Sequence, residues 1–219
     1  MAEQLRGFGP AGLAAILIVV LAGTVTLGSV AVPLGGLLAL AWAKWSATPW
    51  AQIGYRAPRS WLGSVAGGIA LGIVLKLLMK AVVMPLLGAG PINPAYHYLA
   101  GNQALLPAAV WAMLMAGFGE ETVFRGFLFE RFGKLFGSDR RARIVIVLVT
   151  SLLFALAHFR DQGLAGVEQA IVTGLAFGAM FALTGSLWMS ICAHAAFDLT
   201  ALAIIYLNVE ADIAHLIFK

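Results

Sequence analysis

Long apolar runs recur through this sequence, and they constrain its fold more than any other feature. A transmembrane helix needs about 20 mostly apolar residues, because only a helix or a closed barrel satisfies its backbone hydrogen bonds inside lipid. We predict an all-α, polytopic transmembrane helical bundle with about seven spans, within a range of six to eight. The expected spans are 11–27, 32–46, 61–80, 104–130, 143–160, 166–184 and 186–207.

Composition agrees with this prediction and excludes other classes. Charged residues make up 11% of the 219 residues, whereas a soluble globular domain carries about a quarter. No charged or Pro/Ser-rich linker divides the chain, so residues 1–219 are expected to form a single membrane domain. The net charge of +4 does not indicate nucleic-acid binding, because the basic residues cluster in loops between apolar runs. The lone cysteine, Cys192, excludes a disulfide within one chain.

Basic residues also predict the orientation. With a cytoplasmic N-terminus, the side opposite the cytoplasm would carry only Arg160 and Lys219. The positive-inside rule therefore predicts a multi-pass protein with its N-terminus in the cytoplasm and its C-terminus outside. We expect the membrane to be that of a bacterial or archaeal cell. The cytoplasmic side would hold nine of the 14 Lys and Arg residues: Arg6, Lys44, Arg56, Arg59, Arg131, Lys134, Arg140, Arg141 and Arg143.

Three segments need separate interpretation. The sequence "GSVA" at 28–31 imitates a signal-peptide cleavage site, but the apolar stretch continues to Ala43, which favours a helical hairpin that turns near Gly28–Pro33. Lys76 and Lys80 lie one turn apart near the outer end of the third span, where we expect them to reach the lipid headgroups. The segment 81–103 is broken by Pro and Gly, and is expected to be an external or partly embedded loop.

Ionisable residues inside the expected spans are candidates for a functional site, because each is expensive to bury in lipid. The first cluster is "EETVFR" at 120–125. On a helix, Glu121 and Arg125 share a face and can pair, whereas Glu120 points about 100° away. A buried ion pair that fixes helix packing would explain Glu121 and Arg125 but not Glu120. A carboxylate without a cation on its own helix is suited to act as a general base.

Two further clusters lie on the fifth and seventh spans. "FALAHF" at 154–159 contains His158, and "HAAFD" at 194–198 contains His194 and Asp198, which share one helix face. The His194–Asp198 pair could ligate a metal, hold a histidine tautomer, stabilise an oxyanion or simply pack. Groups of this kind from three separate spans are tolerated only around a shared, water-containing cavity. Such a constellation can activate water for hydrolysis.

These clusters, in this order, resemble the motifs of the CPBP family of intramembrane endopeptidases (CAAX protease and bacteriocin-processing, or Abi). The family pattern is Glu-Glu-x-x-x-Arg, then Phe-x-x-x-His, then His-x-x-x-Asn/Asp. The matching residues are Glu120 to Arg125, Phe154 to His158 and His194 to Asp198. The resemblance covers 104–207, the expected catalytic core, and places the catalytic residues on the fourth, fifth and seventh spans.

The resemblance implies a glutamate-type protease without a cofactor. In such an enzyme, Glu120 and His158 would activate a water molecule, and His194 and Asp198 would stabilise the tetrahedral oxyanion. Glu121 and Arg125 would position and tune the site. The expected partners are the lipid bilayer and a membrane-anchored peptide or protein substrate, such as a C-terminal tail, a lipidated peptide or a leader peptide.

Three alternatives remain open at this stage. A zinc-dependent protease could use His158, His194 and Glu120, although the sequence has no HExxH motif. A serine nucleophile at Ser190 could use His194 and Asp198, since these residues are spaced by four, but it leaves Glu120 unexplained. A non-catalytic transporter or scaffold could carry protons or ions on the same groups, although no inverted repeat of the transporter kind is visible.

Overall fold

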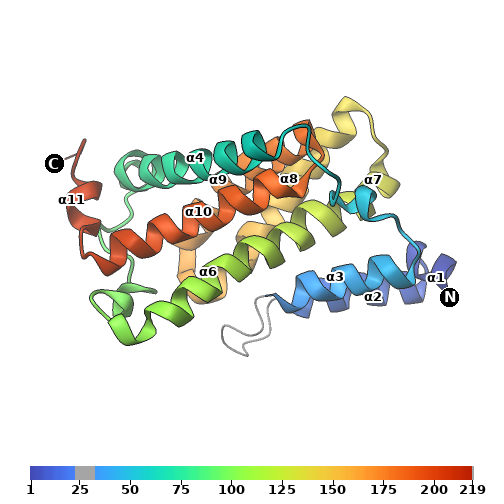
Figure 1. Ribbon diagram of the computed structural model, residues 1–219, viewed down its shortest axis with the longest axis horizontal. Coiled ribbons are helices and arrows are strands. Elements are labelled where there is room, and N and C mark those ends of the chain that lie inside the picture. The colour runs from blue at the N-terminus through green and yellow to red at the C-terminus, as the bar shows by residue number, and fades with distance from the viewer. Residues whose placement is uncertain (23–32, 219) are drawn as a thin grey trace.

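The structure, a computed structural model, describes residues 1–22 and 33–218, and within these ranges it contains helices and loops without strands (Figure 1). The all-α prediction is therefore confirmed. The "GSVA" sequence and the predicted hairpin turn near Gly28–Pro33, except for Pro33 itself, fall on residues 23–32, which lie outside the described ranges. The α-helices are α1 Ala2–Arg6, α2 Pro10–Ala22, α3 Leu34–Trp45, α4 Trp61–Leu78, α5 Met84–Leu86, α6 Leu106–Glu121, α7 Leu128–Phe136, α8 Arg140–Ala157, α9 Phe159–Thr184, α10 Leu187–Tyr206 and α11 Glu210–Ala214. Short 3₁₀ turns are η2 Trp50–Ile53, η4 His97–Leu99 and η5 Gln103–Leu105, and two π-helical turns are η3 Met79–Val83 and η6 Thr122–Phe127.

Three helical stretches in the described ranges are long and apolar enough to cross a membrane. They are Trp61–Leu86, which joins α4, η3 and α5, then α9 and α10. Helix α2 is apolar but shorter. These lengths and compositions support a helical membrane protein. The count of seven spans and the cytoplasmic N-terminus stay predictions.

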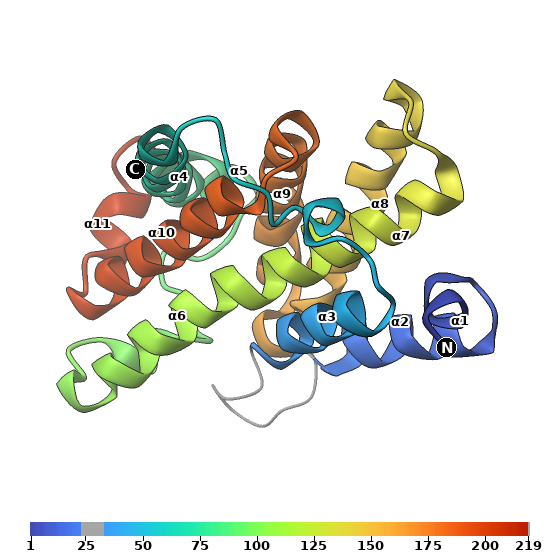
Figure 2. The ribbon, with the colours of Figure 1, turned by 45° about the vertical axis from the view of Figure 1, so that its right-hand side comes forward.

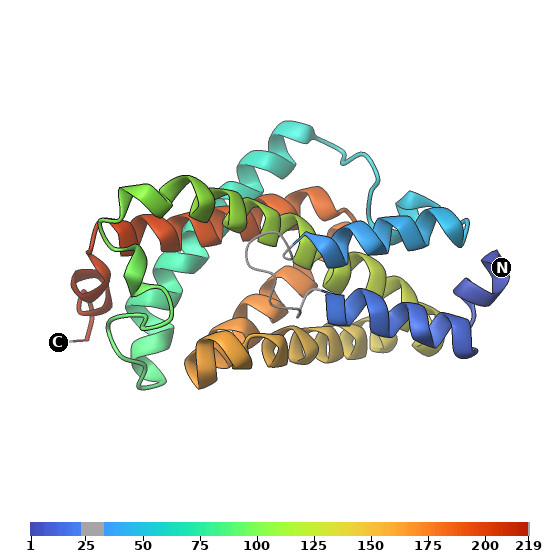
Figure 3. The ribbon, with the colours of Figure 1, turned by 90° about the horizontal axis from the view of Figure 1, so that it is seen from below.

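Helix α10 occupies the centre of the arrangement. It packs against α4 on one side and against α6 on the other, as Figures 1 and 2 both show. Helices α8 and α9 pack against each other, and the α2–α3 pair lies beside α6 at the N-terminal end of the molecule (Figure 3). The elements that carry the three predicted motifs, α6, α8 and α10, therefore belong to one bundle.

Two glycines bring α4 very close to α10. A Cβ atom added at Gly68 would lie 2.6 Å from the carbonyl oxygen of Met189, and one added at Gly72 would overlap the carbonyl oxygen of Ala193. Small residues of this kind let the backbones of membrane helices approach closely, so that van der Waals contacts hold the pair together. The position of α4 against α10 therefore depends on these two glycines.

Replacement of Gly72 by Ala is expected to force the two helices apart and to lower the free energy of unfolding by about 1–3 kcal/mol. Gly67→Ala is the matched control, because its added Cβ would meet only the flexible end of Met189, at 3.4 Å. That control is expected to be neutral or slightly stabilising, since Ala favours a helix over Gly by up to about 1 kcal/mol. Thermal unfolding in detergent measures both variants, and equal effects at the two positions would contradict the close approach.

Candidate active site

The first motif spans the junction between α6 and a π-helical turn. Glu120 and Glu121 end α6, and Arg125 lies within η6, whose six residues are all buried. The Thr122 hydroxyl donates to the Phe118 carbonyl oxygen at 2.6 Å, as Ser and Thr side chains often do in membrane helices. Single π-turns inside α-helices occur frequently at functional sites. The long helix α6–η6–α7 is therefore locally widened where it presents its charged side chains.

His158 is the C-cap residue of α8, near the end of the span predicted over 143–160. Helix α8 stops at Ala157, and the positive φ of 63° at Gly163 interrupts the next helix. His158 Nδ1 lies 2.8 Å from the Phe154 carbonyl oxygen. A carbonyl only accepts, so Nδ1 carries the proton. His158 Nε2 is therefore the atom that faces Glu120, with 3.9 Å between it and Oε2.

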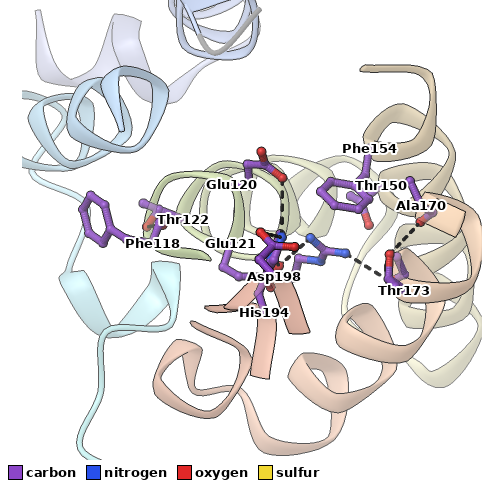
Figure 4. Close-up of polar contacts among 12 residues, drawn as sticks. Phe118, Glu120, Glu121, Thr122, Thr150, Phe154, Ala170, Thr173, His194 and Asp198 are labelled. Carbon is purple, nitrogen blue, oxygen red and sulfur yellow. Dashed lines mark hydrogen bonds and ion pairs between the residues drawn. The ribbon is translucent and has the colours of Figure 1, made fainter. Parts of the chain in front are cut away.

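His194 is buried and contacts all three carboxylates of the site. Its Nδ1–H donates to Glu121 Oε1 at 2.8 Å, which fixes the orientation of the ring. Its Nε2 lies 3.8 Å from Glu120 Oε2 and 3.5 Å from Asp198 Oδ2 (Figure 4). The seventh predicted span thus contributes an imidazole whose second nitrogen points toward the other two acids.

The predicted pair between Glu121 and Arg125 forms, and the same carboxylate also holds His194. Arg125 donates from one terminal nitrogen to Glu121 Oε1 at 2.8 Å and from the other to the Gly174 carbonyl oxygen at 3.3 Å. Its guanidinium carbon lies 4.4 Å from the centre of the Phe154 ring. Both charged side chains are essentially inaccessible to solvent. This network links α6, η6, α9 and α10 around one carboxylate (Figure 4).

Glu120 differs from Glu121 because it is partly open to the cavity, with 27% of its side chain exposed. Its Oε2 has no hydrogen-bond partner among the described residues. The separations of 3.8 and 3.9 Å to the two Nε2 atoms are too long for direct hydrogen bonds. Glu120 therefore approaches both imidazole rings without bonding directly to either.

A cavity of about 880 Å³ lies in front of these groups. Four of the six predicted site residues line it, namely Glu120, His158, His194 and Asp198. Glu121 and Arg125 do not line the cavity. Pockets of this size hold ligands with a small number of polar groups and an otherwise apolar lining. The three predicted motifs therefore converge on one pocket. Four of their polar residues line it, and the Glu121–Arg125 pair is buried next to them.

Lys76 also lines this cavity, and the prediction that it reaches the lipid headgroups is wrong. Lys76 is 7% exposed, and its Nζ donates to Gln169 Oε1 at 3.0 Å. Lys80 is likewise held by protein groups, the Pro91 carbonyl oxygen and Glu210. The overlooked signal is the spacing of Gly68, Gly72 and Lys76, which places the lysine on the face of α4 that packs against α10.

The zinc alternative and the absence of a cofactor both stay predictions. Ligands of a tetrahedral zinc at 2.0–2.1 Å would lie about 3.3 Å from one another, whereas Glu120 lies 3.8 and 3.9 Å from the two imidazoles. Among residues 1–22 and 33–218, no group of three or more His, Cys, Asp or Glu side chains is arranged to hold a metal. The serine alternative also lacks support, because the buried Ser190 Oγ has no hydrogen-bond partner within those ranges.

Residues 102–200 match the model of one protein family, described as type II CAAX prenyl endopeptidase, Rce1-like. This stretch contains all three motifs, and the match confirms the resemblance found in the sequence. It supports hydrolase activity rather than the transporter or scaffold alternative. No curated protein and no solved structure matches the chain.

Removal of Arg125 tests whether the buried network holds the site together. Arg125→Met leaves the Glu121 carboxylate buried with one donor fewer, and is expected to lower the free energy of unfolding by about 3–5 kcal/mol. Lys134→Met is the control, because Lys134 pairs with Glu130 at a partly exposed position and is expected to contribute no more than about 1 kcal/mol. Equal losses of thermal stability in detergent for Arg125→Met and Lys134→Met would contradict the proposed contribution of the Glu121–Arg125 pair to folding.

Proposed function

Residues 102–200 belong to the Rce1-like type II CAAX prenyl endopeptidase family, and on this premise we propose that the chain is a glutamate-type intramembrane endopeptidase. One observation carries the proposal: Glu120 Oε2 lies 3.9 and 3.8 Å from the Nε2 atoms of His158 and His194 without a direct hydrogen bond to either, so that one water molecule bound beside them would contact all three atoms. These three side chains line a cavity of about 880 Å³. A base, two imidazoles and an accessible pocket are the elements that peptide hydrolysis requires.

Water activation is the role proposed for Glu120 and His158. The Nδ1–H of His158 is committed to the Phe154 carbonyl oxygen, so its Nε2 lone pair is free to orient the water. Glu120 accepts a proton from this water as the water oxygen attacks the carbonyl carbon of the scissile bond. When the C–N bond breaks, the proton passes from Glu120 to the leaving nitrogen. The products are a carboxylic acid and an amine, which ionise to a carboxylate and an ammonium group when the acid transfers its proton to the amine.

Stabilisation of the oxyanion is the role proposed for His194. In its doubly protonated form, His194 retains the bond from Nδ1 to Glu121 and donates from Nε2 toward the cavity. Three surrounding carboxylates favour this positive charge. Asp198 Oδ2, at 3.5 Å from Nε2, orients that N–H, and only a protonated Asp198 could itself donate to the oxyanion.

Glu121 and Arg125 are proposed as positioning residues. They do not line the cavity, and Glu121 acts through the Nδ1 atom of His194. Arg125 compensates the charge of Glu121 and joins it to the Gly174 carbonyl oxygen on α9. Second-layer partners of this kind fix a catalytic histidine in one orientation. The proposed substrate is a peptide segment of a membrane-associated protein, because the cavity is too small for a folded domain.

Substitution of the proposed base tests this mechanism. Glu120→Gln and His158→Ala are each expected to lower kcat for cleavage of a membrane-anchored peptide by at least about 10²-fold, because each removes a group that handles the proton. Glu168→Gln serves as the charge-matched control, since Glu168 lies on α9 and does not line the cavity. Full activity of either active-site variant in detergent would exclude the mechanism.

Metal removal tests the proposed absence of a cofactor. Because the carboxylate–imidazole distances do not suit zinc, incubation with EDTA or 1,10-phenanthroline is expected to leave cleavage within about twofold of the untreated enzyme. Elemental analysis of the purified protein accompanies the assay. A loss of more than about tenfold that added Zn²⁺ restores would establish a metalloprotease instead.

A further inference from the structure

Lys76 is a buried cation inside the cavity that the proposed hydrolysis does not use. It lies on α4, outside the stretch matched by the family model, and it faces the pocket together with Gln169 of α9. Burial of an ammonium group in an apolar protein is unfavourable unless the charge has partners. The buried ammonium group of Lys76 therefore needs partners that compensate its charge.

The described residues do not compensate this charge fully. Lys76 donates one hydrogen bond, to Gln169 Oε1, and lies 4.9 Å from the centre of the Phe197 ring. No carboxylate in the described ranges forms an ion pair with it, although the charge of Asp198 acts on it from a greater distance. An ammonium group has three N–H donors, so two of them are available to a ligand in the cavity.

Gln169 adds further donors beside the lysine. Its Oε1 accepts from Lys76, which leaves the two N–H groups of its amide free of that contact. Both side chains line the cavity. A cation and an adjacent amide form a set of donors without a competing anion in direct contact, and this set is complementary to a carboxylate.

We propose that Lys76 and Gln169 form a carboxylate-binding subsite for the substrate, and this inference rests on the proposed peptidase function. The ligand chemistry is a carboxylate on the peptide, either the free C-terminal α-carboxylate or an acidic side chain near the scissile bond. Lys76 is thus a specificity-determining residue, which selects substrates that bring a negative charge into the cavity.

Ring contacts set how far this charge lies from the catalytic groups. The Phe197 ring beneath Lys76 lies 6.3 Å from the Phe177 ring, which in turn lies 5.4 Å from the His194 ring. The three consecutive separations place the Lys76 ammonium at most roughly 17 Å from His194, a distance that about five extended residues span. If the ligand is the α-carboxylate, cleavage occurs within about the last five residues of the peptide.

Peptide pairs that differ by one charge test the subsite. One pair has the same sequence with a free or an amidated C-terminus, and a second pair has Glu or Gln within about five residues of the cleavage point. Cleavage is measured as kcat/KM for the wild type, Lys76→Met and Lys76→Arg. Lys80→Met is the matched control, since it removes a charge one turn away that does not line the cavity.

The wild type is expected to cleave the charged member of one pair at least about tenfold faster than its neutral partner, as a hydrogen bond between charged groups predicts. Lys76→Met is expected to abolish this preference through slower cleavage of the charged peptide alone. Lys76→Arg and Lys80→Met retain the preference. The pair that shows it identifies the source of the carboxylate. The absence of any preference in the wild type would overturn the subsite. An equal loss of kcat/KM on all peptides in Lys76→Met would also overturn it, and would mean that Lys76 acts through Asp198.

A binding assay distinguishes a failure of the proposed subsite from a failure of the proposed reaction. Fluorescence anisotropy of the same labelled peptides is measured on full-length Glu120→Gln, with and without Lys76→Met. Charge-dependent binding without any cleavage by the wild type would support the subsite and defeat the peptidase proposal. Cleavage by the wild type with charge-independent binding and rates would retain the peptidase and defeat the subsite.

Discussion

The site depends on one buried carboxylate, that of Glu121. Its Oε1 accepts hydrogen bonds from Arg125 and from His194, each at 2.8 Å. In a protein interior an ion pair of this kind is favourable only when further hydrogen bonds satisfy its members. Arg125 donates one to the Gly174 carbonyl oxygen, whereas the buried Glu121 Oε2 has no partner among the described residues. Because the bond to Glu121 fixes the His194 ring, it also determines that Nε2 faces Glu120 and Asp198.

Helix packing converts this network into an accessible pocket. The glycines of α4 let that helix lie directly against α10, which brings Lys76 to the cavity wall. The end of α8 at Ala157 places His158 opposite Glu120, so that the base is shared between two imidazoles rather than bound tightly to one. Glu120 Oε2 thereby stays without a hydrogen-bond partner among the described residues, whereas Glu121, its neighbour in sequence, is bound by Arg125 and His194.

Much of the site was predictable, because membrane burial makes each polar residue conspicuous. Apolar runs identified the helices, and the spacing of Glu121 and Arg125 identified their pair. Contacts between distant helices were not predictable, since helical spacing reports only on a single helix. The bond from His194 to Glu121, the break beside His158 and the π-turn that begins at Thr122 all belong to this group. Lys76 was misassigned because its depth depends on how closely α4 approaches α10.

In the proposed mechanism, Glu120 and the two imidazoles hold a water molecule within the helical bundle. An experimental density map of the protein in a lipid nanodisc, at a resolution that shows ordered water, tests it most directly. We expect one water within hydrogen-bond distance of Glu120 Oε2 and of the Nε2 atoms of His158 and His194. A metal ion at about 2.0–2.1 Å from these atoms, or a Glu120 side chain turned toward the acyl chains, would contradict it.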